Sequence, residues 1–251
     1  MSGTHGASRS SNMGLIVPAA LPSSRKDLEE KLGIFARISS VNRVQIDIVD
    51  GHFASPISWP YNSPGELHRM VEHGETLPWL DHFEYEIDLM CKDAEQAVGD
   101  WLTLGASRLT FHAESTSDMP RLLAAVRRRY GTDAGFTSDL IALGLTQNLA
   151  NDFSLIESCL HEVEYIQFMG IAQIGQQGQP FDSRVLKTVR IFRTQHPEIT
   201  LQVDGGISLE NAKELIALGV SNLIIGSVLL RANDPAAVIA RFEALQKPYG
   251  M

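Results

Sequence analysis

Three aspartates of this chain occupy positions at which a charged side chain has no evident structural role. Asp47 and Asp88 lie inside short apolar runs, and Asp204 directly follows another such run. A carboxylate in apolar surroundings is costly unless it is paired, protonated or bound to a metal. Two such carboxylates can act as general acid and general base, and a cluster of them can hold a hard divalent cation. We therefore predict that Asp47, Asp88 and Asp204 belong to one functional site.

Small residues follow the last two apolar runs of the chain. Gly205 and Gly206 precede a predicted helix, and Gly226 and Ser227 precede a short helical turn. Glycine lets the backbone approach an anion closely, and the N–H groups at the start of a helix donate hydrogen bonds to it. These two segments predict a phosphate site; the alternative is that the glycines serve only their turns.

The apolar runs alternate with amphipathic segments along the whole chain. Eight runs predict the buried strands of a parallel sheet, and eight segments between them have helical periodicity. The predicted strands are 14–17, 43–49, 83–90, 107–112, 141–145, 163–169, 199–203 and 222–226, and the predicted helices are 25–38, 64–73, 93–104, 117–130, 152–161, 183–195, 209–218 and 235–245. Eight such units predict a single closed (β/α)8 TIM barrel. The alternative, an open doubly wound sheet, is weaker because no G-x-G-x-x-G follows the first run.

In a barrel of this kind, functional residues lie where the strands end. Alternation along the run 43–49 places Gln45 and Asp47 on one face, and of the acids in the run 83–90 only Asp88 is expected to reach the site. We interpret His112, which ends another run, as a structural hydrogen-bonding residue.

One helix start has a clear capping signal. Ser208 precedes the predicted helix 209–218 and is expected to cap it, but Asn211 stands where a full capping box would have Glu or Gln. We therefore predict a capped helix without a complete box.

The composition and the net charge exclude several classes of protein. The 251 residues are 44% hydrophobic and 20% charged, and the net charge of −9 argues against nucleic acid as a partner. No apolar stretch approaches the roughly 20 residues of a membrane-spanning helix, and two cysteines are too few for a disulfide framework. We expect a cytoplasmic protein without a signal peptide and with no membrane partner.

Residues 1–12, rich in Ser and Gly, are predicted to be a disordered tail, and 13–247 to be the barrel domain.

The motifs at the predicted strand ends resemble those of the ribulose-phosphate 3-epimerase family, whose members are phosphate-binding (β/α)8 barrels. The clearest example is Val44–Phe53, which resembles the family's aliphatic-His-Val-Asp-Val-Met-Asp-Gly-His-Phe. Further family motifs are matched, in chain order, by residues 87–90, 111–114, 178–181, 203–207 and 226–227. The likeness extends over residues 14–246.

The resemblance implies roles for individual residues. Asp47 and Asp204 match the two family aspartates that bind the divalent metal and serve as acid and base, whereas the two metal-ligand histidines are replaced by Gln45 and Asp88. The resemblance also implies phosphate binding by Gly178, Gly205, Gly206, Gly226 and Ser227, and a lining role for Ala19, Met90 and Met169.

The altered ligand set changes the expected metal. Imidazole suits zinc, whereas Gln45, Asp47, Asp88 and Asp204 offer only oxygen, which suits hard cations. We expect Mg²⁺, Mn²⁺ or Fe²⁺ rather than tightly bound Zn²⁺. Two other interpretations are a metal-free acid–base pair, in which at least one carboxyl group holds a proton, and a disabled remnant of the family's site.

The function that follows is an isomerase that epimerises a ketose phosphate by proton transfer between two aspartates, through an enediolate. One alternative is another phosphate-binding barrel enzyme, such as a lyase or decarboxylase; the segment 47–50 lacks the lysine of the Asp-x-Lys-x-x-Asp array found in relatives of orotidine-phosphate decarboxylase. A second alternative is a non-catalytic sugar-phosphate-binding protein, although such a protein gains nothing from buried carboxylates. The expected partner is a small sugar phosphate, and a homo-oligomer is expected.

Overall fold

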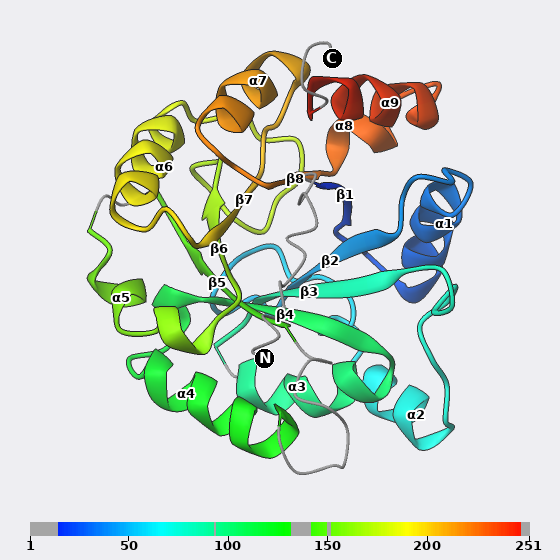
Figure 1. Ribbon diagram of the computed structural model, residues 1–251. Helices are drawn as coiled ribbons and strands as arrows, with labels where there is room; N and C mark the ends of the chain where they lie inside the picture. Colours follow the sequence, from blue (N-terminus) through cyan, green and yellow to red (C-terminus); the bar gives the residue numbers. More distant parts are fainter. Residues whose placement is uncertain (1–14, 93, 132–141, 150–151, 247–251) are drawn as a thin grey trace, which may run out of the picture.

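The computed structural model of the protein describes residues 15–92, 94–131, 142–149 and 152–246, so the predicted tail 1–12 lies outside the described residues. Eight strands form one closed sheet in chain order, and every neighbouring pair is parallel (Figure 1). This closure confirms the predicted (β/α)8 barrel and excludes the open doubly wound sheet.

The strands coincide closely with the predicted apolar runs because each is buried along nearly its whole length. They are β1 (Leu15–Ala20), β2 (Arg43–Val49), β3 (Glu84–Met90), β4 (Ala106–His112), β5 (Ala142–Gln147), β6 (Tyr165–Met169), β7 (Thr200–Asp204) and β8 (Asn222–Ile225). Register places Asp47 of β2 beside Asp88 of β3, and Met169 of β6 beside Asp204 of β7. All four residues stand at or near the carboxyl ends of their strands.

Helices surround the barrel in the described part of the chain (Figure 1). They are α1 (Arg25–Phe35), α2 (Glu66–Glu72), α3 (Ala94–Thr103), α4 (Met119–Val126), α5 (Ser154–Glu157), α6 (Arg184–Gln195), α7 (Leu209–Ala217), α8 (Ser227–Leu230) and α9 (Pro235–Gln246). The prediction of one helix over 152–161 is wrong: α5 ends after four residues, and a 3₁₀ turn follows at Leu160–Glu162. Ser158 and Cys159, both weak helix formers, lie at the break.

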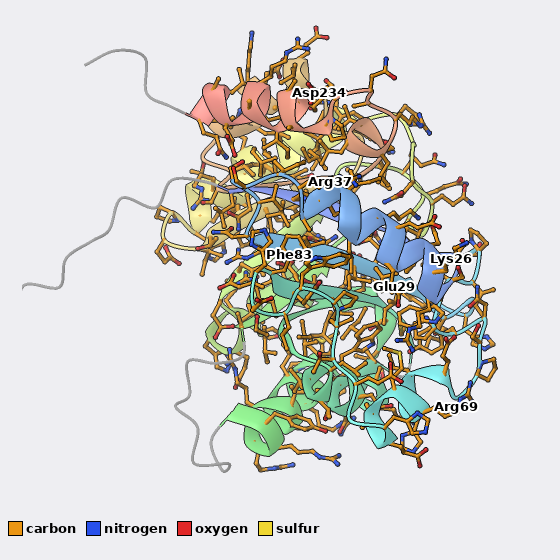
Figure 2. All side chains as sticks on the ribbon, turned by 90° about the vertical axis from the view of Figure 1, so that its right-hand side faces the viewer. Lys26, Glu29, Arg37, Arg69, Phe83 and Asp234 are labelled. Carbon is orange, nitrogen blue, oxygen red and sulfur yellow. The ribbon has the colours of Figure 1, made fainter. Side chains whose placement is uncertain are left out.

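The helix α1 shows how these segments attach to the barrel. Leu28, Leu32 and Phe35 are buried on its inner face, whereas Lys26 and Glu29 project from its outer face (Figure 2). No helix in the described ranges is long and apolar enough to cross a membrane.

The start of α7 differs from the prediction, which was a capped helix without a complete capping box. The Ser208 hydroxyl accepts from the N–H of Asn211 at 3.4 Å, and the Asn211 side-chain oxygen accepts from the N–H of Ser208 at 2.8 Å. The capping box is therefore complete, because the amide oxygen of Asn reaches the backbone as that of Gln would. It fixes the beginning of α7 just after Gly205 and Gly206.

The two sides of the sheet differ in polarity. The outer side is covered by the apolar core, which includes large side chains such as Trp59 of the segment after β2, Trp101 of α3 and Phe192 of α6. The inside of the barrel instead contains buried polar side chains, namely Gln45, Asp47, Glu86, Asp88, Thr110, Gln167, Gln202 and Asn222. Buried polar groups need partners, and the contacts of these residues determine the geometry of the site.

Candidate active site at the mouth of the barrel

The three aspartates singled out by sequence converge at the mouth of the barrel. One carboxylate oxygen of each lies within 4.8 Å of those of the other two. Asp88 is fully buried, and Asp47 and Asp204 are 6% and 9% exposed. Three carboxylates this close repel one another unless a cation or a proton intervenes.

Gln45 stands between two of these carboxylates. Its Nε2 donates to Oδ1 of Asp47 at 2.8 Å and to Oδ2 of Asp204 at 3.1 Å. Its Oε1 is buried and has no hydrogen-bond partner in the described chain. In this orientation Gln45 offers a nitrogen that cannot coordinate a metal, so a ligand role requires its amide to turn.

Asp88 is held from two neighbouring directions. Nε2 of His112 lies 2.9 Å from its Oδ1, and Nε2 of Gln167 donates to its Oδ2 at 3.5 Å. The His112 ring is fully buried and packs against the ring of Phe53, with 5.2 Å between the ring centroids. His112 is thus a hydrogen-bonding neighbour of the carboxylate cluster.

Burial and mutual repulsion alter the acidity of the site. Burial, followed by the charge of Asp88, raises the pKa of Asp47 to about 7. Burial, followed by the charge of Asp47, raises the pKa of Asp204 well above its usual range. Asp47 can therefore hold and release a proton near neutral pH, and burial beside it favours the protonated form of Asp204.

The same cluster fits a hard cation. It contributes three buried carboxylates, and ions such as Mg²⁺ and Mn²⁺ prefer oxygen ligands. A divalent ion would also replace the proton that the raised pKa values imply. The residues present are consistent with such an ion.

A cavity lies directly above the aspartates. All predicted site residues except Gln45 and Asp88 line it, and these are Ala19, Asp47, Met90, Met169, Gly178, Asp204, Gly205, Gly206, Gly226 and Ser227. Gln45 and Asp88 do not line it, but Gln45 donates to Asp47 and Asp204, and a carboxylate oxygen of Asp88 lies within 4.8 Å of theirs. The cavity therefore connects the predicted acid–base pair to the predicted phosphate loops.

Glycine is required at one end of this cavity. Gly205 and Gly206 have φ values of 105° and 67°, in the left-handed region that favours glycine. A Cβ on Gly206 would lie 2.6 Å from backbone atoms of Phe181. Because Gly205 and Gly206 have no side chain, it is their backbone atoms that face a ligand at this end of the cavity.

The segment after β6 reaches across the cavity in two places. Nε2 of Gln177 donates to the carbonyl of Ala19 at 3.3 Å, and Nε2 of Gln176 donates to that of Ser55 at 3.4 Å. Both glutamines line the cavity. Sequence reasoning did not identify either of them, because a loop glutamine carries no signal that distinguishes it.

Gln167 was also missed, although a signal was present. It is a polar residue inside the otherwise apolar strand β6, as Asp47 is inside β2. The same argument that selected Asp47 applies to it. The structure places it within hydrogen-bonding reach of Asp88.

Comparison with known proteins finds relatives over most of the chain. The model of the ribulose-phosphate 3 epimerase family matches residues 15–230. The ribulose-phosphate 3-epimerase of Escherichia coli (strain K12) is 27% identical over 229 residues, covering 90% of this chain and 92% of that protein. The enzyme of the same name from Aquifex aeolicus is 24% identical over 237 residues, covering 93% and 97%.

Solved structures share the fold at low sequence identity. KGPDC from Streptococcus mutans has a TM-score of 0.63 at 15% identity, covering 93% of this chain and 97% of that one. The 3-hexulose-6-phosphate synthase of Salmonella typhimurium has a TM-score of 0.62 at 15% identity, covering 92% and 98%.

Proposed function

The chain belongs to the ribulose-phosphate 3-epimerase family, and we propose that it epimerises a ketose phosphate. The observation that carries the proposal is the pairing of Asp47 with Asp204. Both aspartates line one cavity, and one amide nitrogen donates to both of them. The family's enzymes act on sugar phosphates, and this pair supplies the groups that the reaction needs.

Epimerisation beside a ketone requires a base on one face of the substrate and an acid on the other. Asp47 extends from β2 and Asp204 from β7, and β8 and β1 separate these strands in the barrel. In our proposal one aspartate removes the proton from the carbon next to the carbonyl, and the other returns a proton to the opposite face. The pKa of Asp47, raised to about 7, supports this role, because a group that both accepts and donates works best with a pKa near the operating pH. The pKa of Asp204 is raised in the same direction.

Asp47, Asp88 and Asp204 would hold a hard divalent cation, with Mg²⁺, Mn²⁺ or Fe²⁺ preferred over tightly bound Zn²⁺. Gln45 would join them through Oε1 once its amide has turned. Such a cation supplies a Lewis acid for the negative charge that develops on the substrate oxygen.

The other end of the cavity would bind the phosphate group. We assign this role to the backbone around Gly205, Gly206, Gly226 and Ser227, with Gly178 in the facing loop. Ala19, Met90 and Met169 would line the sugar. Fixing the phosphate places the carbon to be epimerised beside the two aspartates, which lowers the entropic part of the barrier.

The test is proton exchange in heavy water. Pentulose and hexulose phosphates are incubated with the protein and with Mg²⁺, Mn²⁺, Fe²⁺ or Zn²⁺, and the products are analysed by NMR. We expect an inverted product that carries deuterium at the epimerised carbon. A binder would retain the sugar phosphate without exchange, and a lyase or decarboxylase would break a carbon–carbon bond; either result would replace the epimerase proposal.

A further inference from the structure

Gln167 lies inside the barrel and is fully buried. It does not line the cavity, so it is outside the acid–base pair and the phosphate loops. Its position on β6 nevertheless brings its amide to the Asp88 carboxylate. The direction in which that amide points decides whether it attracts or repels Asp88.

The amide of Gln167 is fixed by a second glutamine. Its Oε1 accepts from Nε2 of Gln202 at 2.9 Å, which leaves its own Nε2 to face Oδ2 of Asp88 at 3.5 Å. If the Gln167 amide were reversed, its oxygen would face the carboxylate and its nitrogen would face the donor group of Gln202. Both contacts would then be repulsive.

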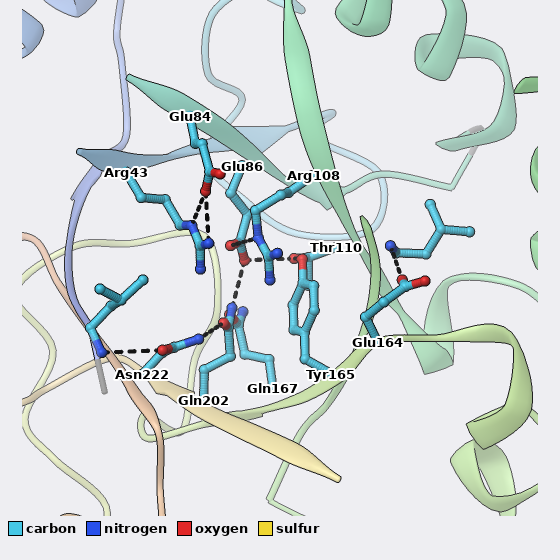
Figure 3. A network of polar contacts seen from close by, with 12 residues as sticks. Arg43, Glu84, Glu86, Arg108, Thr110, Glu164, Tyr165, Gln167, Gln202 and Asn222 are labelled. Carbon is cyan, nitrogen blue, oxygen red and sulfur yellow. Dashed lines mark hydrogen bonds and ion pairs between the residues drawn. The ribbon is translucent and has the colours of Figure 1, made fainter. Parts of the chain in front are cut away.

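Gln202 is in turn fixed on both sides (Figure 3). Its Nε2 also donates to Oε1 of Glu86 at 2.5 Å, and its Oε1 accepts from Nδ2 of Asn222 at 3.0 Å. Asn222 cannot reverse without a loss, because its Oδ1 accepts from the backbone N–H of Leu15 at 3.3 Å. The orientation of Gln202 is therefore determined by its neighbours.

Glu86 anchors this series of amides. It is fully buried and accepts from Nε of Arg108 and from Oγ1 of Thr110, each at 3.0 Å. A carboxylate beside a guanidinium offers only acceptor oxygens, so Gln202 must present its nitrogen there. Figure 3 shows the contacts converging on Glu86 from several strands.

We propose that Gln167 is a positioning residue for Asp88, and that Glu86 and Gln202 set the direction of its amide. His112 holds one oxygen of Asp88 and Gln167 holds the other, so the carboxylate is fixed in one plane at the mouth of the barrel. The functional consequence rests on the proposed role of Asp88 as a metal ligand. Neighbours that orient a ligand typically contribute 10–100-fold to metal affinity.

The first experiment measures Mn²⁺ affinity by electron paramagnetic resonance of the free ion, without any substrate. Gln167→Met and Gln202→Met keep the length of the side chain and remove its amide. We expect each to weaken Mn²⁺ binding by roughly tenfold or more. The matched control is Thr110→Val, which removes a different hydrogen bond to Glu86 and leaves the contacts between Gln202, Gln167 and Asp88 in place.

The control separates positioning from general stability. Thermal unfolding is followed for all three variants, and Thr110→Val is expected to lower the melting temperature while retaining the Mn²⁺ affinity of the parent. An equal loss of affinity in Thr110→Val and Gln167→Met would overturn the proposal, as would unchanged affinity in both glutamine variants.

A second measurement does not depend on the metal. Crystal structures of the parent and of Gln202→Met are compared at a resolution that distinguishes amide nitrogen from oxygen. We expect the Gln167 nitrogen to face Asp88 in the parent, and the Gln167 side chain to lose its single position in the variant, because its Oε1 no longer has the Gln202 donor. A parent that binds no Mn²⁺ would contradict the metal site alone. A Gln167 nitrogen that faces away from Asp88 in the parent, or a Gln167 side chain whose position is unchanged in Gln202→Met, would contradict the positioning role.

Discussion

Asp47 and Asp88 are register partners on adjacent parallel strands, so their side chains leave the barrel wall side by side at its mouth. Both belong to paired strands, so their backbone positions cannot separate unless a strand moves. This proximity contributes, after burial, to the raised pKa of Asp47. A positive charge between the two carboxylates, either a proton or a cation, therefore stabilises the site.

The acid–base assignment predicts the effect of two isosteric changes. Asp47→Asn and Asp204→Asn keep the shape of each side chain and remove its ionisable group. We expect each to lower the rate of epimerisation by roughly 10²–10⁴-fold, the usual cost of losing a general acid or base. Deuterium exchange should persist, if at all, only on the face served by the remaining aspartate.

A matched control for this series is Asp234→Asn. Asp234 accepts from the N–H of Ala237 at the start of α9, where Asn caps equally well, and the residue does not line the cavity. Its rate should equal that of the parent. Full exchange on both faces in both site variants would show that other groups carry the proton.

The raised pKa of Asp47 predicts how stability depends on pH without metal. The folded protein favours the protonated carboxyl group, whereas the unfolded chain ionises it above pH about 4. The resulting stability is present at low pH and is lost as pH rises towards about 7. A shift from 3.8 to about 7 corresponds to roughly 4 kcal/mol, or about 10 °C in melting temperature.

The measurement compares the parent with Asp47→Asn in a chelating buffer between pH 4.5 and 7.5. The difference between their melting temperatures reports on Asp47 together with its effect on Asp204, and it removes the contribution of carboxyl groups elsewhere in the chain. We expect the parent to lose stability relative to the variant as pH rises, and added Mn²⁺ to reverse the loss. A difference that stays constant across this range would contradict the assigned pKa.

The sequence was sufficient to predict the barrel and the convergence of its aspartates. Strands buried on both faces appear as apolar runs, and a closed parallel barrel brings their carboxyl ends to one mouth. Asp47 and Asp88 were detectable because a charge inside such a run has few structural explanations. The short α5 was not predictable, since the periodicity of 152–161 favoured one continuous helix.

Amide directions could not be predicted in the same way. The nitrogen of Gln45 faces Asp47 and Asp204 only because the closed barrel brings side chains of β2 and β7 together in its interior. The direction of Gln167 depends on Gln202 and Glu86 from two other strands. Residues far apart in sequence decide these contacts together. No local sequence pattern predicts whether the nitrogen or the oxygen of a side-chain amide will face a carboxylate.

The phosphate assignment predicts the effect of added negative charge. Ser227 lines the cavity at the beginning of α8, and Ser227→Asp places a carboxylate where the anion is expected. Inorganic phosphate should then inhibit more weakly and KM for a sugar phosphate should rise. Ser183→Asp is the control, because Ser183 also precedes a helix but does not line the cavity. Equal phosphate inhibition in the parent and in Ser227→Asp would place the anion elsewhere.

The last prediction concerns the two positions at which the family resemblance implies that a metal-ligand histidine has been replaced. Gln45 donates to Asp47 and Asp204, and a carboxylate oxygen of Asp88 lies within 4.8 Å of theirs. Replacing Gln45 and Asp88 in Gln45→His/Asp88→His supplies two imidazole nitrogens and removes one negative charge. Because imidazole favours zinc over magnesium and manganese, the ratio of Zn²⁺ to Mn²⁺ affinity should rise in the double variant. Competition between the two ions, measured by metal analysis after dialysis, checks this without reference to activity. The parent should retain little Zn²⁺ after treatment with a chelator, whereas the double variant should retain it. A parent that already holds stoichiometric Zn²⁺ through such treatment would show that the oxygen-only ligand set does not determine the choice of metal.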